Sequence, residues 1–120
     1  MAGKNGHYEV PRRKAAIRFE GTAYDGAEVV CRLDVPLQMF LDFQRMAART
    51  DDPEVLEQTF RRFGDEVLES WNLSEGGKEV PATADGFLRQ PPAFAMLILS
   101  KWMESIGAAP DPLVAPVPVN

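Results

Sequence analysis

Few side chains in this sequence could carry covalent or metal chemistry. His7 and Cys31 are its one histidine and its one cysteine. A thiol nucleophile needs a base held against it, but His7 lies in a polar N-terminal stretch with no hydrophobic period to fix it in place. One imidazole and one thiol are also too few for a zinc site. We therefore expect Cys31 to be a small core residue and the protein not to be an enzyme.

Two groups of carboxylates are the next candidates, because they could hold a hard cation weakly. They are Asp51, Asp52, Glu54 and Glu57, and Asp65, Glu66 and Glu69. Helix capping, the helix dipole and a solvated helix face explain both groups without a ligand. The run Gly76-Gly77-Lys78 lacks the spacing and the preceding strand of a phosphate-binding loop, so we expect a simple turn there. The sequence predicts no metal and no cofactor.

The charge of the chain is negative and unevenly distributed. Thirteen Lys and Arg against eighteen Asp and Glu give a net charge of −5, with +3 in residues 1–20 and −8 in residues 21–120. An acidic protein repels phosphate backbones and anionic lipids. The longest apolar run, residues 93–99, is far shorter than the ~20 residues of a membrane span. Neither nucleic acid nor a membrane is expected as a partner, and a lone cysteine favours a reducing cytosol.

Composition divides the 120 residues into three segments. Residues 1–14 form a basic arm, expected to be flexible because it contains glycine and no periodic apolar residues. Residues 15–108 are long enough to bury a core and are expected to form one α+β domain. Residues 109–120 form a proline-rich tail, which suits an extended conformation rather than a helix or a strand.

The folded segment begins with a predicted β-hairpin. Residues 15–20 and 28–35 are rich in β-branched or aromatic side chains, and the glycines between them suit a turn. In the second strand, alternation places Val29 and Cys31 on the core face together with Leu33 and Val35. The hairpin is expected to pack against a small bundle of helices.

Three main helices are predicted. Asp34 caps the first, and its stripe is expected to meet the hairpin through Leu37, Phe40, Leu41, Gln44 and Ala48. Asp52 caps the second, which begins at Pro53, stops at Asn72 and has a core face of Leu56, Phe60, Phe63, Val67 and Trp71. Thr83 caps a short turn, and the third helix runs over residues 91–106, with apolar side chains around most of its circumference.

The apolar side chains of these helices exceed what one small hairpin can cover. Methionines recur at helical spacing in the pairs Met39 and Met46, and Met96 and Met103, and flexible thioethers suit adaptable binding surfaces. We expect self-association into a homo-oligomer or a partner helix in a groove. The residues assigned to this partner-binding surface are Met39, Phe43, Met46, Phe94, Leu97, Ile98 and Trp102.

Three segments of the sequence also resemble a known family. They lie within residues 63–73, 80–88 and 94–104 and include Trp71-Asn72-Leu73, Pro81-Ala82-Thr83 and Trp102-Met103-Glu104. In their order and spacing they resemble the tail assembly chaperones of long-tailed (siphovirus-type) bacteriophages, particularly those infecting actinobacteria. The resemblance covers roughly residues 15–110, and the basic arm lies outside it.

This resemblance implies a non-catalytic protein that binds the phage tape-measure protein. It would keep that long helical client soluble while tail tube subunits polymerise around it. Such families often make a longer form by translational frameshifting, whose extension binds the tail tube protein. The resemblance places the protein in the cytoplasm of the infected bacterial host and not in the mature virion.

Two other classes of protein fit the size and the fold class. One is a structural virion component, such as a head-tail connector or a minor tail protein. The other is a small protein that binds a host factor. Neither alternative needs a catalytic residue, so the lack of a paired nucleophile and base does not separate them from a chaperone.

Overall fold

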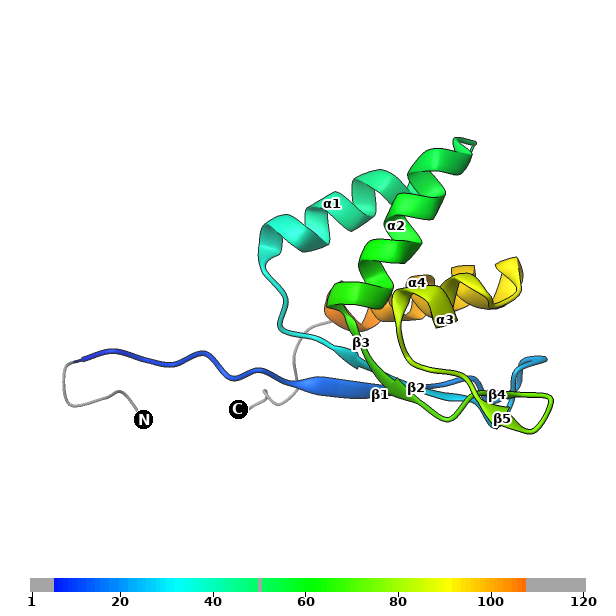
Figure 1. Ribbon diagram of the computed structural model, residues 1–120. Helices are drawn as coiled ribbons and strands as arrows, with labels where there is room; N and C mark the ends of the chain where they lie inside the picture. The colour runs from blue at the N-terminus through cyan, green and yellow to red at the C-terminus, as the bar shows by residue number, and fades with distance from the viewer. Residues whose placement is uncertain (1–5, 50, 108–120) are drawn as a thin grey trace.

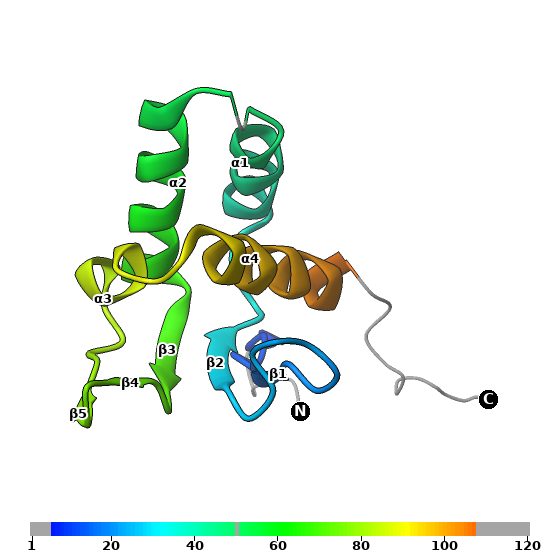
Figure 2. The same cartoon turned by 90° about the vertical axis from the view of Figure 1, so that its right-hand side faces the viewer.

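The computed structural model describes residues 6–49 and 51–107, and the predicted proline-rich tail, 109–120, lies outside them, as does the start of the predicted arm. The α+β class is confirmed: a three-stranded antiparallel sheet carries helices on one side (Figures 1 and 2). In chain order the elements are β1 (Lys14–Arg18), β2 (Glu28–Arg32), α1 (Leu37–Ala47), α2 (Pro53–Glu66), β3 (Leu68–Trp71), β4 (Ser74–Glu75), β5 (Lys78–Glu79), α3 (Ala84–Leu88) and α4 (Pro92–Gly107).

The predicted N-terminal hairpin is confirmed. Strands β1 and β2 pair antiparallel, with Ala15 opposite Cys31 and Ile17 opposite Val29. The side chains of Val29 and Cys31 have no exposed area, as their alternation along the strand predicts. Strand β1 begins at Lys14, one residue before the predicted start of the folded segment.

The end of the second predicted helix is wrong. Helix α2 stops at Glu66, and the following four residues form strand β3, which pairs with β2 and completes the sheet. Pairing supplies the reason, because the backbone N–H of Arg32 donates to the carbonyl of Val67 and Ser70 lies opposite Val30. Within β3, Leu68 is buried and Ser70 is exposed, although residues i and i+2 share one face of a regular strand. The register shift between Val30 and Cys31 explains the difference, because it leaves Glu69 as an extra residue of β3.

The start of α1 also differs from the prediction. Pro36 is the N-cap and makes no side-chain cap bond. The carboxylate of Asp34 instead accepts from the backbone N–H of Arg13 at 2.6 Å and from its guanidinium at 2.8 Å and 2.9 Å. Asp34 therefore fixes the entry into β1 rather than capping the helix.

The face that α1 turns to the core is the second correction there. Leu37 is 70% exposed and Leu41 41% exposed, so this predicted stripe does not meet the hairpin. Phe43 is fully buried and Met39 is partly buried against the core. The reason is position: α4 lies between the sheet and the α1–α2 pair, so α1 packs on α4 and α2 (Figure 2).

Other local predictions are confirmed. The Asp52 side chain accepts from the N–H groups of Glu54 and Val55 at the start of α2. The Thr83 hydroxyl accepts from the N–H of Gly86 and caps α3. Gly76 and Gly77 have positive φ angles, 58° and 81°, and form the turn between β4 and β5.

Helices α2 and α3 pack unusually closely. A Cβ atom added at Gly64 of α2 would lie 2.5 Å from the Cα of Ala84, the first residue of α3. Glycine is therefore needed in the last turn of α2 because any side chain there would meet backbone. This contact sets α3 against the helix pair and places Phe87 beside Phe63, with ring centroids 5.1 Å apart.

Candidate functional site

Four of the residues assigned to the partner-binding surface lie in the core. Phe43, Ile98 and Trp102 have no exposed area, and Phe94 is 4% exposed. The ring of Trp102 lies 5.2 Å from that of Phe43 and 5.4 Å from that of Phe63, edge to face. Fully packed side chains cannot meet a partner at the surface, so these four residues are removed from the candidate site.

The other three assigned residues are partly buried. Met39, Met46 and Leu97 pack against the outside of the core cluster. Met46 also lines a hollow beside Arg45, Arg49 and Arg62, but each of these arginines pairs with a neighbouring carboxylate. Of the three, only Met46 lines this hollow, so Met39, Met46 and Leu97 do not line one common site.

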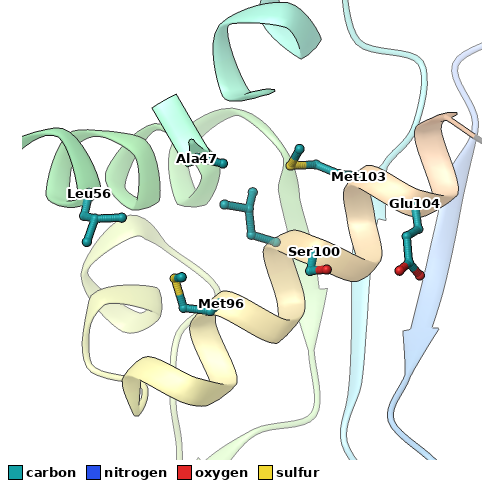
Figure 3. Close-up of a pocket in the computed structure, with 7 residues that line it drawn as sticks. Ala47, Leu56, Met96, Ser100, Met103 and Glu104 are labelled. Atoms are coloured by element: carbon teal, nitrogen blue, oxygen red, sulfur yellow. The ribbon is translucent and has the colours of Figure 1, made fainter. Parts of the chain in front are cut away.

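An apolar groove lies instead between α4 on one side and the end of α1 and the beginning of α2 on the other (Figure 3). Its volume is about 450 Å³, and it opens to solvent. The lining residues are Ala47, Leu56, Met96, Leu99, Ser100, Met103 and Glu104. Two of the lining side chains, Ala47 and Ser100, are small, which leaves space in the hollow.

The spacing along α4 determines the shape of the groove. Met96, Ser100 and Met103 fall at i, i+4 and i+7, so they lie on one helix face. Met96 is 40% exposed, whereas Leu99 beneath it is 4% exposed and forms the floor. Residues 96–104 span about 12 Å at 1.5 Å per residue, which is the length of roughly two helical turns.

The chemistry of the groove is that of apolar binding. Glu104 at one end is the one charged side chain in its lining. The two methionines are unbranched and adapt their shape to a ligand. A groove of this length and composition fits two turns of an amphipathic helix, entering with apolar side chains at i, i+4 and i+7.

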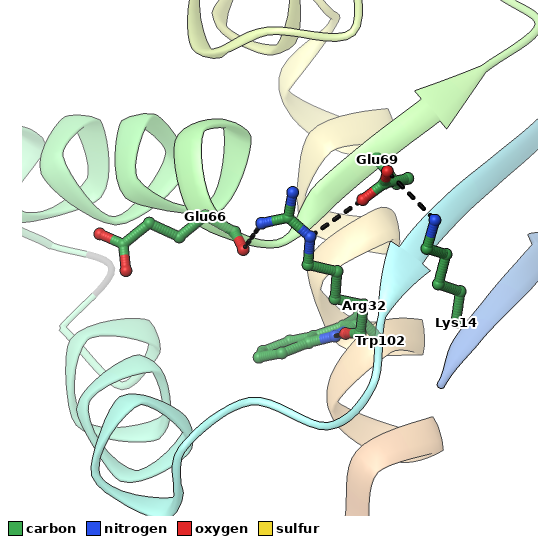
Figure 4. Close-up of polar contacts among 5 residues, drawn as sticks. All are labelled: Lys14, Arg32, Glu66, Glu69 and Trp102. Atoms are coloured by element: carbon green, nitrogen blue, oxygen red, sulfur yellow. Dashed lines mark hydrogen bonds and ion pairs between the residues drawn. The ribbon is translucent and has the colours of Figure 1, made fainter. Parts of the chain in front are cut away.

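A hydrogen bond joins α4 to the sheet, and further polar contacts of the same strand residue join the strands and the end of α2 (Figure 4). The indole Nε1 of Trp102 donates to the backbone carbonyl of Arg32 at 2.8 Å. The guanidinium of Arg32 donates to the carbonyl of Glu66 and, at 2.9 Å, to the carboxylate of Glu69. Lys14 donates to the same carboxylate at 3.2 Å. Hydrogen bonds from Lys14 and Arg32 lower the pKa of Glu69 from its usual 4.5.

The residues singled out for possible catalysis are not brought together. Cys31 has no exposed area, and burial raises the pKa of its thiol to about 12. His7 is exposed in the extended segment before β1. Within residues 6–49 and 51–107, no group of three or more His, Cys, Asp or Glu side chains could hold a metal ion.

Two carboxylates of the groups considered as cation sites make structural contacts within the protein. Asp52 caps α2, and Glu69 bridges Lys14 and Arg32 across the sheet. The cap agrees with the expectation for Asp52, whereas Glu69, expected on the solvated face of the second helix, lies in β3.

Comparison of the chain with protein-family models, curated proteins and solved structures finds no match. In the part of the chain that the structure describes, no helix has the length and apolar character needed to cross a membrane. The site is therefore assigned from the geometry of this chain alone.

Proposed function

We propose that this protein is a binding protein without catalytic function, and that the groove along α4 holds an apolar stripe of a helical client. The observation that carries the proposal is the exposed Met96 beside an open apolar hollow. An apolar surface of this kind is costly to leave in water and marks an interaction site.

The resemblance to phage tail assembly chaperones names the client. The client is the tape-measure protein, whose long helices present repeated apolar stripes, and several copies of the chaperone cover it before the tube forms. A longer, frameshifted form would bring the tail tube protein to the same client. The net charge of −5 adds long-range attraction to any basic segment of the client.

Co-expression tests this proposal. The chain is produced together with the longest open reading frame just downstream in its genome, which is the expected tape-measure gene. We expect the client to stay soluble and to co-elute with several copies of the chain. An insoluble client without co-elution would contradict the proposal.

Two further measurements separate the alternatives. Mass spectrometry of purified phage particles should not detect the chain, since a chaperone is released before assembly ends. Its presence there in stoichiometric amount would favour a virion component. Growth inhibition of the host by the chain alone, with capture of one host protein, would favour a host-factor-binding protein.

A further inference from the structure

The groove along α4 has a methionine on each side of its centre. Met96 and Met103 lie about 5 Å on either side of the midpoint between Leu99 and Ser100, at 1.5 Å per residue. If a second α4 lies antiparallel across this midpoint, Met96 of each copy faces Met103 of the other. A methionine pair then fills each half of the contact, in keeping with a two-fold interface.

We propose that, without a client, the groove is covered by a second copy of this chain, with the two α4 helices antiparallel and crossing between Leu99 and Ser100. This inference rests on the proposed function only because both use the groove along α4, and the dimer needs no client. It also gives the expected self-association a definite surface.

Ser100 permits the two helices to approach closely. Its side chain is small and exposed at the middle of the groove, where a longer residue would hold the helices apart. Ala47, on the opposite wall, leaves room for the methionines of the second copy. Leu99 forms an apolar floor beneath the crossing point.

Charge complementarity also favours the antiparallel direction. The first turn of α4 carries no acidic residue, although a negative charge there would complement the helix dipole. In the proposed dimer, Glu104 of each copy lies level with Ala95 in the first turn of the other copy. Each copy thus supplies the carboxylate that the other helix lacks, and the two glutamates stay apart.

Disulfide trapping tests the crossing point on the free chain, without any client. Ser100→Cys places a thiol beside the equivalent thiol of the second copy. The matched control, Ser105→Cys, places the thiol on a different face of α4. Proximity raises the effective concentration of the second thiol, so we expect Ser100→Cys to form linked dimers at least about tenfold faster under mild oxidation. The native Cys31 is buried and does not compete.

Equal cross-linking rates for the two variants would overturn the proposed crossing.

Light scattering gives an independent measurement on variants without an added cysteine. The wild type and Leu41→Asp should show a dimer mass that falls on dilution, and Met96→Asp should stay monomeric, since Met96 and Leu41 are equally exposed, at 40% and 41%. A wild type that is monomeric at every concentration would overturn this inference and leave the client proposal intact. Dimer trapping without client solubilisation would contradict the client proposal alone.

Discussion

Trp102 and Arg32, 70 residues apart in the sequence, are joined by a hydrogen bond of 2.8 Å from the indole N–H to the backbone carbonyl. The bond fixes α4 to β2 at a side chain with no exposed area. Because Arg32 also donates to the carbonyl of Glu66, the same residue holds the end of α2. Arg32 therefore connects α4, which forms one wall of the groove, to both the sheet and the end of α2.

Replacing the indole of Trp102 by a smaller side chain should lower the free energy of unfolding through two effects. Trp102→Phe keeps an aromatic ring but leaves the Arg32 carbonyl without its donor, which costs about 1–3 kcal/mol of unfolding free energy. Trp102→Ala adds a cavity and should cost about 3–5 kcal/mol. Urea unfolding measures both. Equal stability of Trp102→Phe and the wild type would show that the bond contributes nothing.

Gly64→Ala separates helix propensity from close packing. Alanine is the better helix former by about 1 kcal/mol, so propensity alone predicts a more stable protein. The added Cβ would lie 2.5 Å from the Cα of Ala84, and we therefore expect a loss of about 1–3 kcal/mol instead.

The matched control for this substitution is Asp65→Ala, the exposed neighbour on the same helix. It should change the unfolding free energy by no more than about 0.5 kcal/mol. Thermal unfolding of the two variants gives the comparison. A rise in melting temperature for Gly64→Ala would contradict the close approach of α2 and α3.

The Lys14–Glu69–Arg32 cluster predicts a stability that depends on pH. The folded-state pKa of Glu69 lies below its usual 4.5. Its carboxylate therefore makes its full contribution to the free energy of unfolding above pH 4.5, and this contribution is lost as the pH falls through the lower folded-state pKa. Glu69→Gln removes this contribution. At pH 7 the wild type should unfold at a higher urea concentration than the variant, and this difference in urea midpoint should disappear toward pH 3. A gap of constant size would contradict the assigned charge pairing.

The thiol of Cys31 should be inert in the folded protein. Its pKa of about 12 leaves a thiolate fraction more than about a thousandfold below that of a free cysteine, whose pKa is about 8.5. An aromatic disulfide reagent at pH 8 should react only after the protein is unfolded in urea. Rapid reaction of the folded protein would show that β2 opens to solvent.

Elements determined by neighbouring residues could be predicted from the sequence. The hairpin β1–β2 follows from alternation around a glycine turn, and the caps Asp52 and Thr83 act within three residues of themselves. Strand β3 could not be predicted this way, because Val67 and Trp71 continue the helical spacing of Phe63. Its backbone partner, β2, lies more than 30 residues earlier, so only tertiary pairing selects the strand.

The site was harder to predict than the fold. Apolar side chains surround most of α4, so periodicity cannot tell which stripe stays open. Burial by the sheet, α1 and α2 leaves the stripe of Met96 and Met103 and removes Ile98 and Trp102. The small Ser100 between two methionines was the available signal, and its meaning depends on Ala47 of α1, which lines the same groove.

The most direct test of the account is co-expression of the expected tape-measure client with two matched variants. Met96→Asp and Leu41→Asp each place one carboxylate at an equally exposed position, 40% and 41%, but only Met96 lines the groove. The account predicts that Leu41→Asp keeps the client soluble and that Met96→Asp, shown to be folded by circular dichroism, loses it. Equal client recovery with both variants would contradict the assignment of the groove as the binding site.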